Sequence, residues 1–153
     1  MDIRENESGE VLLPAGRFIK EEYSNVKLPC RSTTGSAGYD FYYPFSDSET
    51  IKPGQSLKFS TNIIADIKPG WVLLLFPRSG LGMKGIRIAN TVGVIDSDYK
   101  LPIHCKLVND GEEDITLNYN DRFMQGVFVR YGIAEDEDLV DTERTGGMGS
   151  TGK

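Results

Sequence analysis

Short runs of apolar residues at strand-like spacing recur along the whole chain. In one of them Ile103, Cys105 and Leu107 alternate with polar residues, which gives a period of two residues. Residues 57–63 repeat the alternation and place their larger side chains on one face. A period of two is typical of a strand with one buried face, so both runs predict β-strands.

Two further runs complete this pattern. Residues 71–76 (WVLLLF) are continuously apolar, which predicts a strand covered on both sides, and residues 124–131 are rich in β-branched and aromatic residues. No stretch sustains a helical period for three turns, so at most one short helical turn is expected, over residues 79–83. Turn signals separate the runs at residues 52–55, 68–71, 109–113 and 119–122. Many short strands at regular spacing predict an all-β, antiparallel sandwich, jelly roll or barrel.

The two ends of the chain differ from this body. Residues 1–16 are largely polar and are expected to be a loosely ordered extension, with the β domain over residues 17–133. Residues 134–143 are acidic and read as an exposed linker. They lead into a glycine-rich tail, so residues 134–153 form the third predicted segment.

Composition limits the function classes. The 153 residues suit one domain, and the net charge of −6 argues against stable binding along a nucleic-acid backbone. A small anionic ligand stays possible, because a few arginines and backbone amides make a local positive site. No apolar run approaches the roughly 18 residues of a membrane span and no signal-peptide pattern is present, so an intracellular protein without a membrane segment is expected.

Two cysteines and one histidine exclude a disulfide framework and a cysteine–histidine metal cluster. Buried free thiols are the preferred interpretation of Cys30 and Cys105. His104 lies on the polar phase of its strand and reads as a surface or packing residue. With this single histidine, covalent acyl chemistry is a poor fit.

Residues 76–86 (FPRSGLGMKGI) are the first candidate for ligand chemistry. After an apolar strand, Arg78, Ser79 and Gly80 combine a permanent charge, a hydroxyl and flexible backbone, which together can surround a phosphate. The spacing of a P-loop is absent. An ordinary strand-to-turn junction with a surface arginine is the open alternative.

Residues 90–100 (NTVGVIDSDYK) predict a β-hairpin with an acidic tip. Gly93 removes a side chain where a flat ligand could enter. Asp96 follows two apolar residues, so it is the carboxylate expected to be partly buried and able to orient a water or act as general base. Ser97 and Asp98 read as turn formers.

Three other polar residues carry structural interpretations on residue type alone. Asp40 lies between Tyr39 and Phe41 in an aromatic strand, where a lone acid usually pairs with an arginine. Arg122 and Gln125 flank a strand start, and an internal salt bridge is the simplest interpretation there.

The order of these motifs is more specific than any one of them. GSAGYDF, PRSGLGMKGI, NTVGVIDSDYK, DRFMQGV and the terminal GGMGSTG resemble the five ordered motifs of the trimeric dUTP pyrophosphatases (dUTPases), from about Thr34 to Gly152. The resemblance implies a jelly-roll-like homotrimer with active sites at subunit interfaces. It also implies cleavage of dUTP to dUMP and pyrophosphate with Mg²⁺.

The resemblance assigns a role to each matching residue. Asp96 is similar to the aspartate that activates the water, and Asp40 to the acid that helps hold the hydrated metal through water. Tyr99 is similar to the tyrosine that packs on deoxyribose. The remaining substrate contacts implied are the uracil slot of Asn90, Gly93, Val94 and Ile95; the phosphate contacts of Arg78, Ser79, Gly80 and Gln125; and the C-terminal lid of Arg144, Met148, Gly149, Ser150 and Thr151.

This chain departs from the family pattern at three positions. Met148 stands where phenylalanine usually covers the uracil, Arg144 is one residue closer to the glycine pair, and Leu101 follows the tyrosine segment where glycine is common. Three alternatives remain. A nucleotide-dependent regulatory protein with an unknown partner would keep the fold, a dCTP deaminase needs a glutamate that residues 101–109 lack, and a structural jelly roll would not need the five motifs.

Overall fold

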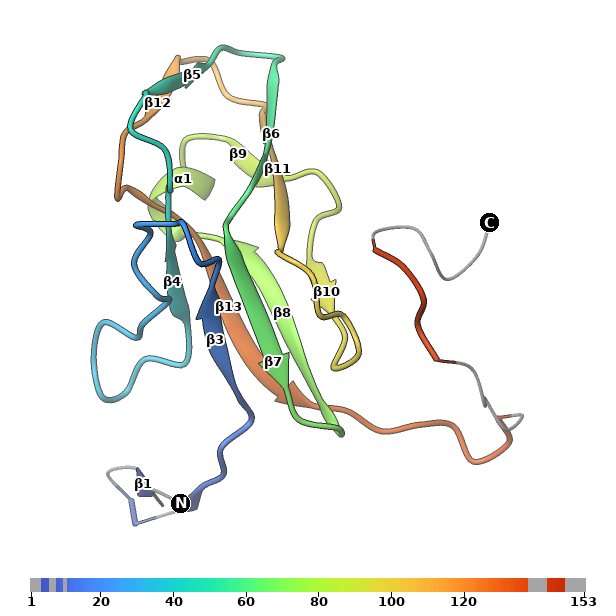
Figure 1. Cartoon of the computed structure of the whole chain (residues 1–153). Helices are drawn as coiled ribbons and strands as arrows, with labels where there is room; N and C mark the ends of the chain where they lie inside the picture. Colours follow the sequence, from blue (N-terminus) through green and yellow to red (C-terminus); the bar gives the residue numbers. More distant parts are fainter. Residues whose placement is uncertain (1–3, 6–7, 10, 138–142, 148–153) are drawn as a thin grey trace.

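The computed structural model describes residues 4–5, 8–9, 11–137 and 143–147. These residues form thirteen strands and one short helix (Figure 1). In chain order the elements are β1 (Arg4–Glu5), β2 (Val11–Leu12), β3 (Gly16–Lys20), β4 (Tyr39–Tyr42), β5 (Glu49–Ile51), β6 (Ser56–Ser60), β7 (Ile63–Ile67), β8 (Trp71–Pro77), α1 (Ser79–Gly82), β9 (Ile86–Ile88), β10 (Gly93–Ile95), β11 (His104–Asn109), β12 (Ile115–Leu117) and β13 (Arg122–Arg130).

Every strand pairing in the described residues is antiparallel, as the turn-rich pattern predicts. A four-stranded sheet has the order β10-β8-β13-β4, and a three-stranded sheet has the order β6-β11-β9. The pairs β12-β5, β3-β7 and β1-β2 complete the pairing. Many of these neighbours are distant in sequence, so the fold is a jelly-roll-like all-β architecture, and that prediction is confirmed (Figure 1).

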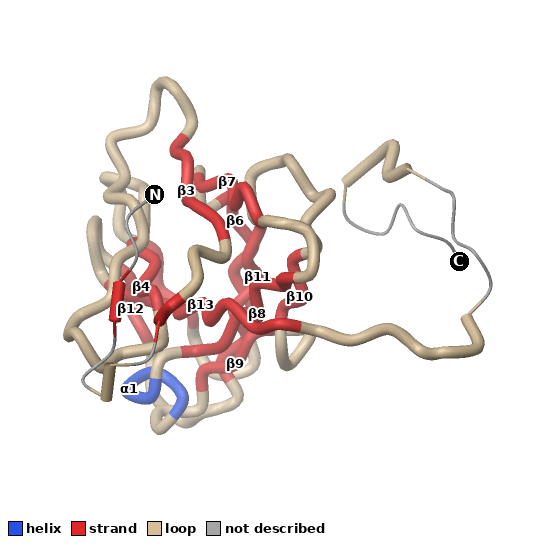
Figure 2. The backbone as a smooth tube through the Cα atoms, turned by 90° about the horizontal axis from the view of Figure 1, so that it is seen from below, coloured by secondary structure: helices blue, strands red, loops and turns tan. Residues whose placement is uncertain are grey.

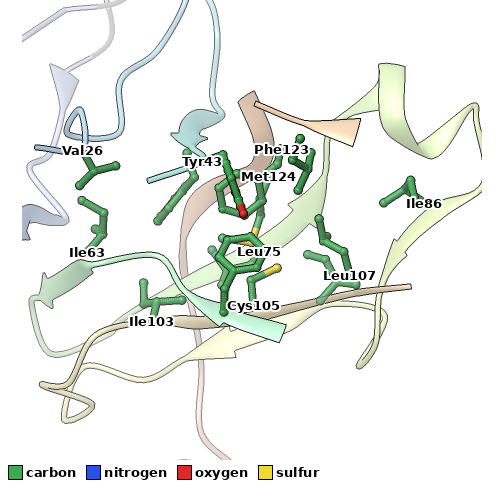
Figure 3. Close-up of a cluster of buried hydrophobic side chains, with 14 of the residues drawn as sticks. Val26, Tyr43, Ile63, Leu75, Ile86, Ile103, Cys105, Leu107, Phe123 and Met124 are labelled. Atoms are coloured by element: carbon green, nitrogen blue, oxygen red, sulfur yellow. The ribbon is translucent and has the colours of Figure 1, made fainter. Parts of the chain in front are cut away.

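The core lies between the sheets, and β7, β8, β9, β11 and β12 contribute alternate residues to it. Leu75 from β8, Leu107 from β11 and Met124 from β13 meet there, with Tyr43 and Phe123 among the largest fully buried side chains (Figure 3). Ile103, Cys105 and Leu107 are buried while the residues between them are exposed. The predicted alternation of 103–107 is therefore confirmed.

Two strand predictions need correction. The run over residues 57–63 is broken at Asn62, whose φ of 58° is left-handed, so β6 ends at Ser60 and β7 starts at Ile63. Strand β8 is fully buried on one face only, at Leu73 and Leu75, whereas the residues on its other face are half-buried. Apolar content alone did not distinguish a strand covered on both faces from one that packs on a single side within one chain.

Strand β13 forms the bridge between the two strands that carry predicted site residues. It pairs with β8 on one edge and β4 on the other, and a register shift occurs between Arg122 and Met124. A Cβ at Gly126 would lie 2.9 Å from Leu73 Cδ1, so glycine permits this close packing. The register of these two pairings places Gln125 opposite Asp40 in β4 and opposite Phe76 in β8.

The two cysteines have different surroundings. Cys105 is buried, and burial raises the pKa of its thiol to about 12. Cys30 is exposed and lies 3.1 Å from the Tyr42 hydroxyl, so the prediction of two buried thiols is wrong for Cys30. It falls outside the strands, where no alternation indicates burial.

The single described helix, α1, confirms the helical turn expected over residues 79–83. It spans four residues, so no helix in the described ranges has the length or apolar character to cross a membrane. Beyond β13, residues 131–137 are exposed and extend away from the sheets (Figures 1 and 2).

Candidate active site

A pocket of about 540 Å³ opens beside the segment that follows β9. Buried Leu75, Ile88 and Met124 lie on its apolar side. Seven residues that the sequence selected as site candidates line it together: Asn90, Gly93, Val94, Ile95, Asp96, Tyr99 and Arg144. The fold thus gathers one coherent half of the predicted site into one concave surface.

Strand β10 forms one side of this pocket and is an edge strand. It pairs with β8 alone, and the strand that follows it, β11, pairs with β6 and β9 instead. The predicted β-hairpin of residues 90–100 is therefore not a ladder of two adjacent strands. Because only one edge of β10 pairs with a strand in the described part of the chain, backbone groups on its other edge are left for a ligand.

Gly93 has a different structural reason from the one predicted. It is buried, and a Cβ there would lie 2.9 Å from Leu75 Cβ in the paired strand. Glycine is therefore required for the approach of β10 to the Leu75 side chain. The room it creates is filled by Leu75, which itself lines the pocket.

Tyr99 presents a fixed ring to the pocket. Its side chain is buried, its hydroxyl donates to the Pro102 carbonyl at 3.0 Å, and burial raises its pKa. The same carbonyl lies 3.1 Å from Nδ1 of His104, and because a carbonyl only accepts, that nitrogen carries the proton. Tyr99 thus offers a preorganised flat apolar surface.

Asp96 is exposed, which corrects the prediction that it is partly buried. Its side chain is 51% exposed. Strand β10 ends at Ile95, so Asp96 begins the turn that follows, and its carboxylate points outward. Arg144 covers it from the C-terminal segment, with Nη2 donating to Asp96 Oδ2 at 2.6 Å and Nε donating to Asp98 Oδ1 at 2.9 Å. Two carboxylates of one turn therefore hold one guanidinium.

The surroundings of Arg144 make it the most enclosed charged group at the pocket. Its side chain is 12% exposed and its guanidinium lies 5.8 Å from the centre of the Tyr99 ring. The hydrogen bond to Asp98, with the nearby Asp96 charge, raises the pKa of Arg144. Asp98 was read only as a turn former, so its contact with Arg144 is a feature that sequence reasoning missed.

A second group of predicted residues surrounds Asp40. Arg78 Nε lies 2.8 Å from Asp40 Oδ1, while Ser32 Oγ donates to Oδ2 at 2.9 Å and Arg122 lies 3.6 Å from the same oxygen. The Asp40 side chain is only 7% exposed. The predicted pairing of this acid with an arginine is confirmed, and the salt bridge expected at Arg122 is found.

The other members of this second group are Gln125, which contacts a backbone carbonyl, and two exposed residues of α1. Gln125 donates from Nε2 to the Pro77 carbonyl at 3.3 Å, next to Arg78. Ser79 and Gly80 are exposed in α1, and a Cβ at Gly80 would meet nothing within 4 Å. The surface around α1 is therefore open to a ligand.

The two groups lie apart in the chain's fold. None of Arg78, Gln125 and Asp40 lines the pocket, and α1 and β10 lie at different places in both views (Figures 1 and 2). The order of the motifs along the chain does not show which of them meet within one copy of the chain. The remaining predicted site residues, Met148, Gly149, Ser150 and Thr151, lie outside the described residues.

The described residues hold no group of three or more acidic, histidine or cysteine side chains that could bind a metal ion directly. Asp40 has the hard oxygen donors that Mg²⁺ prefers, yet its two oxygens are already engaged by Arg78 and Ser32. The hydrogen bonds to these oxygens are compatible with a contact to Mg²⁺ through water, and that contact stays a prediction.

Comparison with known protein families connects this geometry to one of them, because residues 24–152 match the dUTPase family model. The chain belongs to the dUTPase family. The deoxyuridine 5'-triphosphate nucleotidohydrolase of Caulobacter vibrioides strain NA1000 is 37% identical over 151 residues, which cover 92% of this chain and 97% of the relative. That of Paraburkholderia xenovorans is 41% identical over 133 residues, covering 83% and 90%.

A solved structure agrees with the dUTPase assignment. The crystal structure of the Streptococcus mutans dUTPase aligns with a TM-score of 0.68 at 29% identity, covering 78% of this chain and 98% of that one. The family resemblance read from the five motifs is confirmed.

Two lysines and a histidine of this dUTPase pocket were not predicted as site residues. Lys58 and Lys106 line it, together with His104, which the sequence indicated only as a surface or packing residue. Their common signal is the polar phase of β6 and β11, but polar phase alone does not distinguish a ligand-facing side chain from an ordinary solvated one.

Proposed function

We propose that this chain hydrolyses dUTP to dUMP and pyrophosphate. The observation that carries the proposal is the pocket itself, where Asn90, the edge of β10, Asp96 and Tyr99 line one surface in a member of the dUTPase family. The two relatives described above are named for this activity, and the alignments cover nearly their full lengths.

The uracil slot is assigned to Asn90 and to the backbone of Gly93, Val94 and Ile95. An edge strand offers alternating N–H and C=O groups, and such a row reads the donor and acceptor order of a base. Cytosine presents a reversed order, which would leave buried polar groups unpaired. The Tyr99 ring, fixed through Pro102, packs against the deoxyribose and leaves no room for a 2′-hydroxyl.

Asp96 is assigned as the general base. A water attacks the α-phosphorus, the new oxygen–phosphorus bond forms as the bond to pyrophosphate breaks, and the water proton passes to the Asp96 carboxylate. The carboxylate must first lose its contact with Arg144. The substrate phosphates provide a competing partner for that guanidinium, so binding frees the base and neutralises the triphosphate together.

Phosphate contacts are assigned to Arg78, Ser79, Gly80 and Gln125, with Arg144 and the terminal residues Met148, Gly149, Ser150 and Thr151 closing over the substrate. Because the Arg78 group does not share the pocket of its own chain, we infer that a neighbouring copy supplies it. A homotrimer with sites at its interfaces satisfies this requirement.

Mg²⁺ bound by the substrate phosphates would neutralise their charge and orient them. Asp40 would contact its hydration shell rather than the ion, because Arg78 and Ser32 already engage the carboxylate. The Asp40 carboxylate would thus also hold the Arg78 side chain in position to contact the phosphates.

The direct test is pyrophosphate release from dUTP, dCTP, dTTP and UTP, measured side by side with and without Mg²⁺. We expect dUTP to be the preferred substrate and release to need the metal. No preference for dUTP would refute the proposal. Tight binding of dUTP without release would instead favour a nucleotide-dependent regulatory protein, and ammonia release from dCTP would favour a deaminase, which the glutamate-free β11 makes a poor match.

A further inference from the structure

Two lysines face each other on the strands beside the pocket. Lys58 of β6 and Lys106 of β11 are direct partners in the antiparallel register, and both line the pocket. Directly opposed like charges destabilise a sheet. In the described part of the chain, neither ammonium has a salt bridge or hydrogen-bond partner that would offset the repulsion.

The rest of the pocket does not neutralise this pair. Asp96 is the carboxylate on its lining among the described residues, and Arg144 already binds it at 2.6 Å. Asp96 and Asp98 together balance the charge of Arg144, so Lys58 and Lys106 are the lining cations without a carboxylate partner among the described residues. This local excess of positive charge occurs on a chain whose net charge is −6.

We propose that Lys58 and Lys106 form an anion subsite of the pocket that binds a phosphate or pyrophosphate group. Directly paired residues have Cβ atoms about 5 Å apart, so both ammonium groups reach one phosphate. Each ammonium is a compact charge with three donors, which suits the several acceptor oxygens of such a group. A bound anion converts the repulsion between the lysines into attraction, which explains why the sheet retains the pair.

The subsite shares the pocket with the proposed hydrolysis but uses none of the residues assigned to that reaction. Two sources could supply the anion, namely the phosphate chain of the nucleotide or free pyrophosphate. The two sources present the same chemistry to the lysines.

The test measures the melting temperature of the full-length protein against inorganic pyrophosphate at low salt. The variants are Lys58→Gln, Lys106→Gln and the double variant, with Lys68→Gln as matched control, because Lys68 is exposed and outside the pocket lining. We expect each pocket variant to melt at or above the wild-type temperature without ligand. Pyrophosphate affinity should fall about tenfold or more per lysine removed.

The control should keep the full pyrophosphate response, and the double Lys→Arg variant should keep most of it, because it preserves both charges. An unchanged pyrophosphate response in the double Lys→Gln variant would overturn the proposal. The proposal would also be overturned if the double Lys→Arg variant and the Lys68→Gln control lost as much of the pyrophosphate response as the double Lys→Gln variant.

Kinetics with dUTP separate the two sources. A raised KM at constant kcat in the double Lys→Gln variant identifies the nucleotide phosphates, whereas an unchanged KM with lost inhibition by pyrophosphate identifies the free anion. If wild type binds pyrophosphate through the lysines but releases none from dUTP, the hydrolysis proposal fails and the subsite stands.

Discussion

Two aspartate–arginine pairs of this chain share chemistry but differ in their place in the fold. Asp40 lies in β4 and Arg78 directly follows β8, and the acid is nearly fully buried with Ser32 as a further donor. Asp96 and Arg144 join a turn to the C-terminal segment, and that acid stays half-exposed. The first pair connects β4 to the residue that follows β8, whereas the second connects the turn after β10 to the C-terminal segment.

This difference indicates how stability and function are divided. A buried carboxylate with several donors is costly to disturb, because its partners lose their compensation when it is removed. A half-exposed carboxylate contributes little to stability, because water replaces its partner. The proposed release of Arg144 from Asp96 to a triphosphate would therefore cost the fold little, whereas Asp40 is suited to hold Arg78 in place.

The largest effect is expected for Asp96→Asn. The amide keeps the size of the side chain but is no base, so kcat for dUTP should fall by about 10²–10⁴. The exposed position predicts a melting temperature close to that of the wild type. Pyrophosphate release and thermal unfolding of the same preparation measure both quantities, and near-wild-type release would remove Asp96 from the mechanism.

Asp40→Asn should lower the stability of the fold, which Asp96→Asn should leave nearly unchanged. The amide loses the charge that holds Arg78 and Arg122, and unfolding should become about 1–3 kcal/mol easier. This value lies below that of a fully buried ion pair, because both arginines can turn toward solvent. Denaturant unfolding measures the loss, with Asp96→Asn as the exposed counterpart. Equal stability of the two variants would contradict the contrast drawn between the pairs.

The smallest effect is expected at a third, exposed site, Asp66. Its hydrogen bonds to Lys100 and Arg17 lower the pKa of the carboxyl in the folded state. A lowered folded pKa contributes stability above the unfolded pKa, which is lost as pH falls through the folded value. Asp66→Asn should therefore cost at most about 1 kcal/mol at pH 7. The difference from wild type should begin to shrink below about pH 4 and vanish once the pH is below the lowered pKa of the folded carboxyl.

Unfolding of wild type and Asp66→Asn across pH 3–7 tests this expectation. If the stability difference between wild type and Asp66→Asn grew as the pH fell, the predicted direction of the pH dependence would be wrong. A cost as large as that of Asp40→Asn would show that exposure does not separate the pairs.

Local pattern was a good guide wherever one strand face was buried. The alternation at Ile103, Cys105 and Leu107 and the helical turn after Arg78 could be predicted because each depends on neighbouring residues in the chain. The pairing of Asp40 with an arginine was also predictable, since a charge among aromatic residues needs compensation.

The break of residues 57–63 at Asn62 is a local failure, whereas other failures depend on how the chain continues in space. Asp96 was expected to be partly buried from the residues before it, but its exposure depends on where the turn points after β10. The partner strand of β10 is β8 rather than the strand that follows it. The contact between Asp98 and Arg144 spans 46 residues, and no local pattern carries that information.

By itself the sequence determined the all-β class, the buried face of residues 103–107 and membership of the dUTPase family, because periodicity and the order of motifs can be read along the chain. Only the tertiary structure decided that Arg78 and Asp96 lie in separate groups and that Lys58 and Lys106 meet at the pocket. The physical reason is strand pairing. Backbone hydrogen bonds join segments far apart in the chain, and the register between them decides which side chains become neighbours.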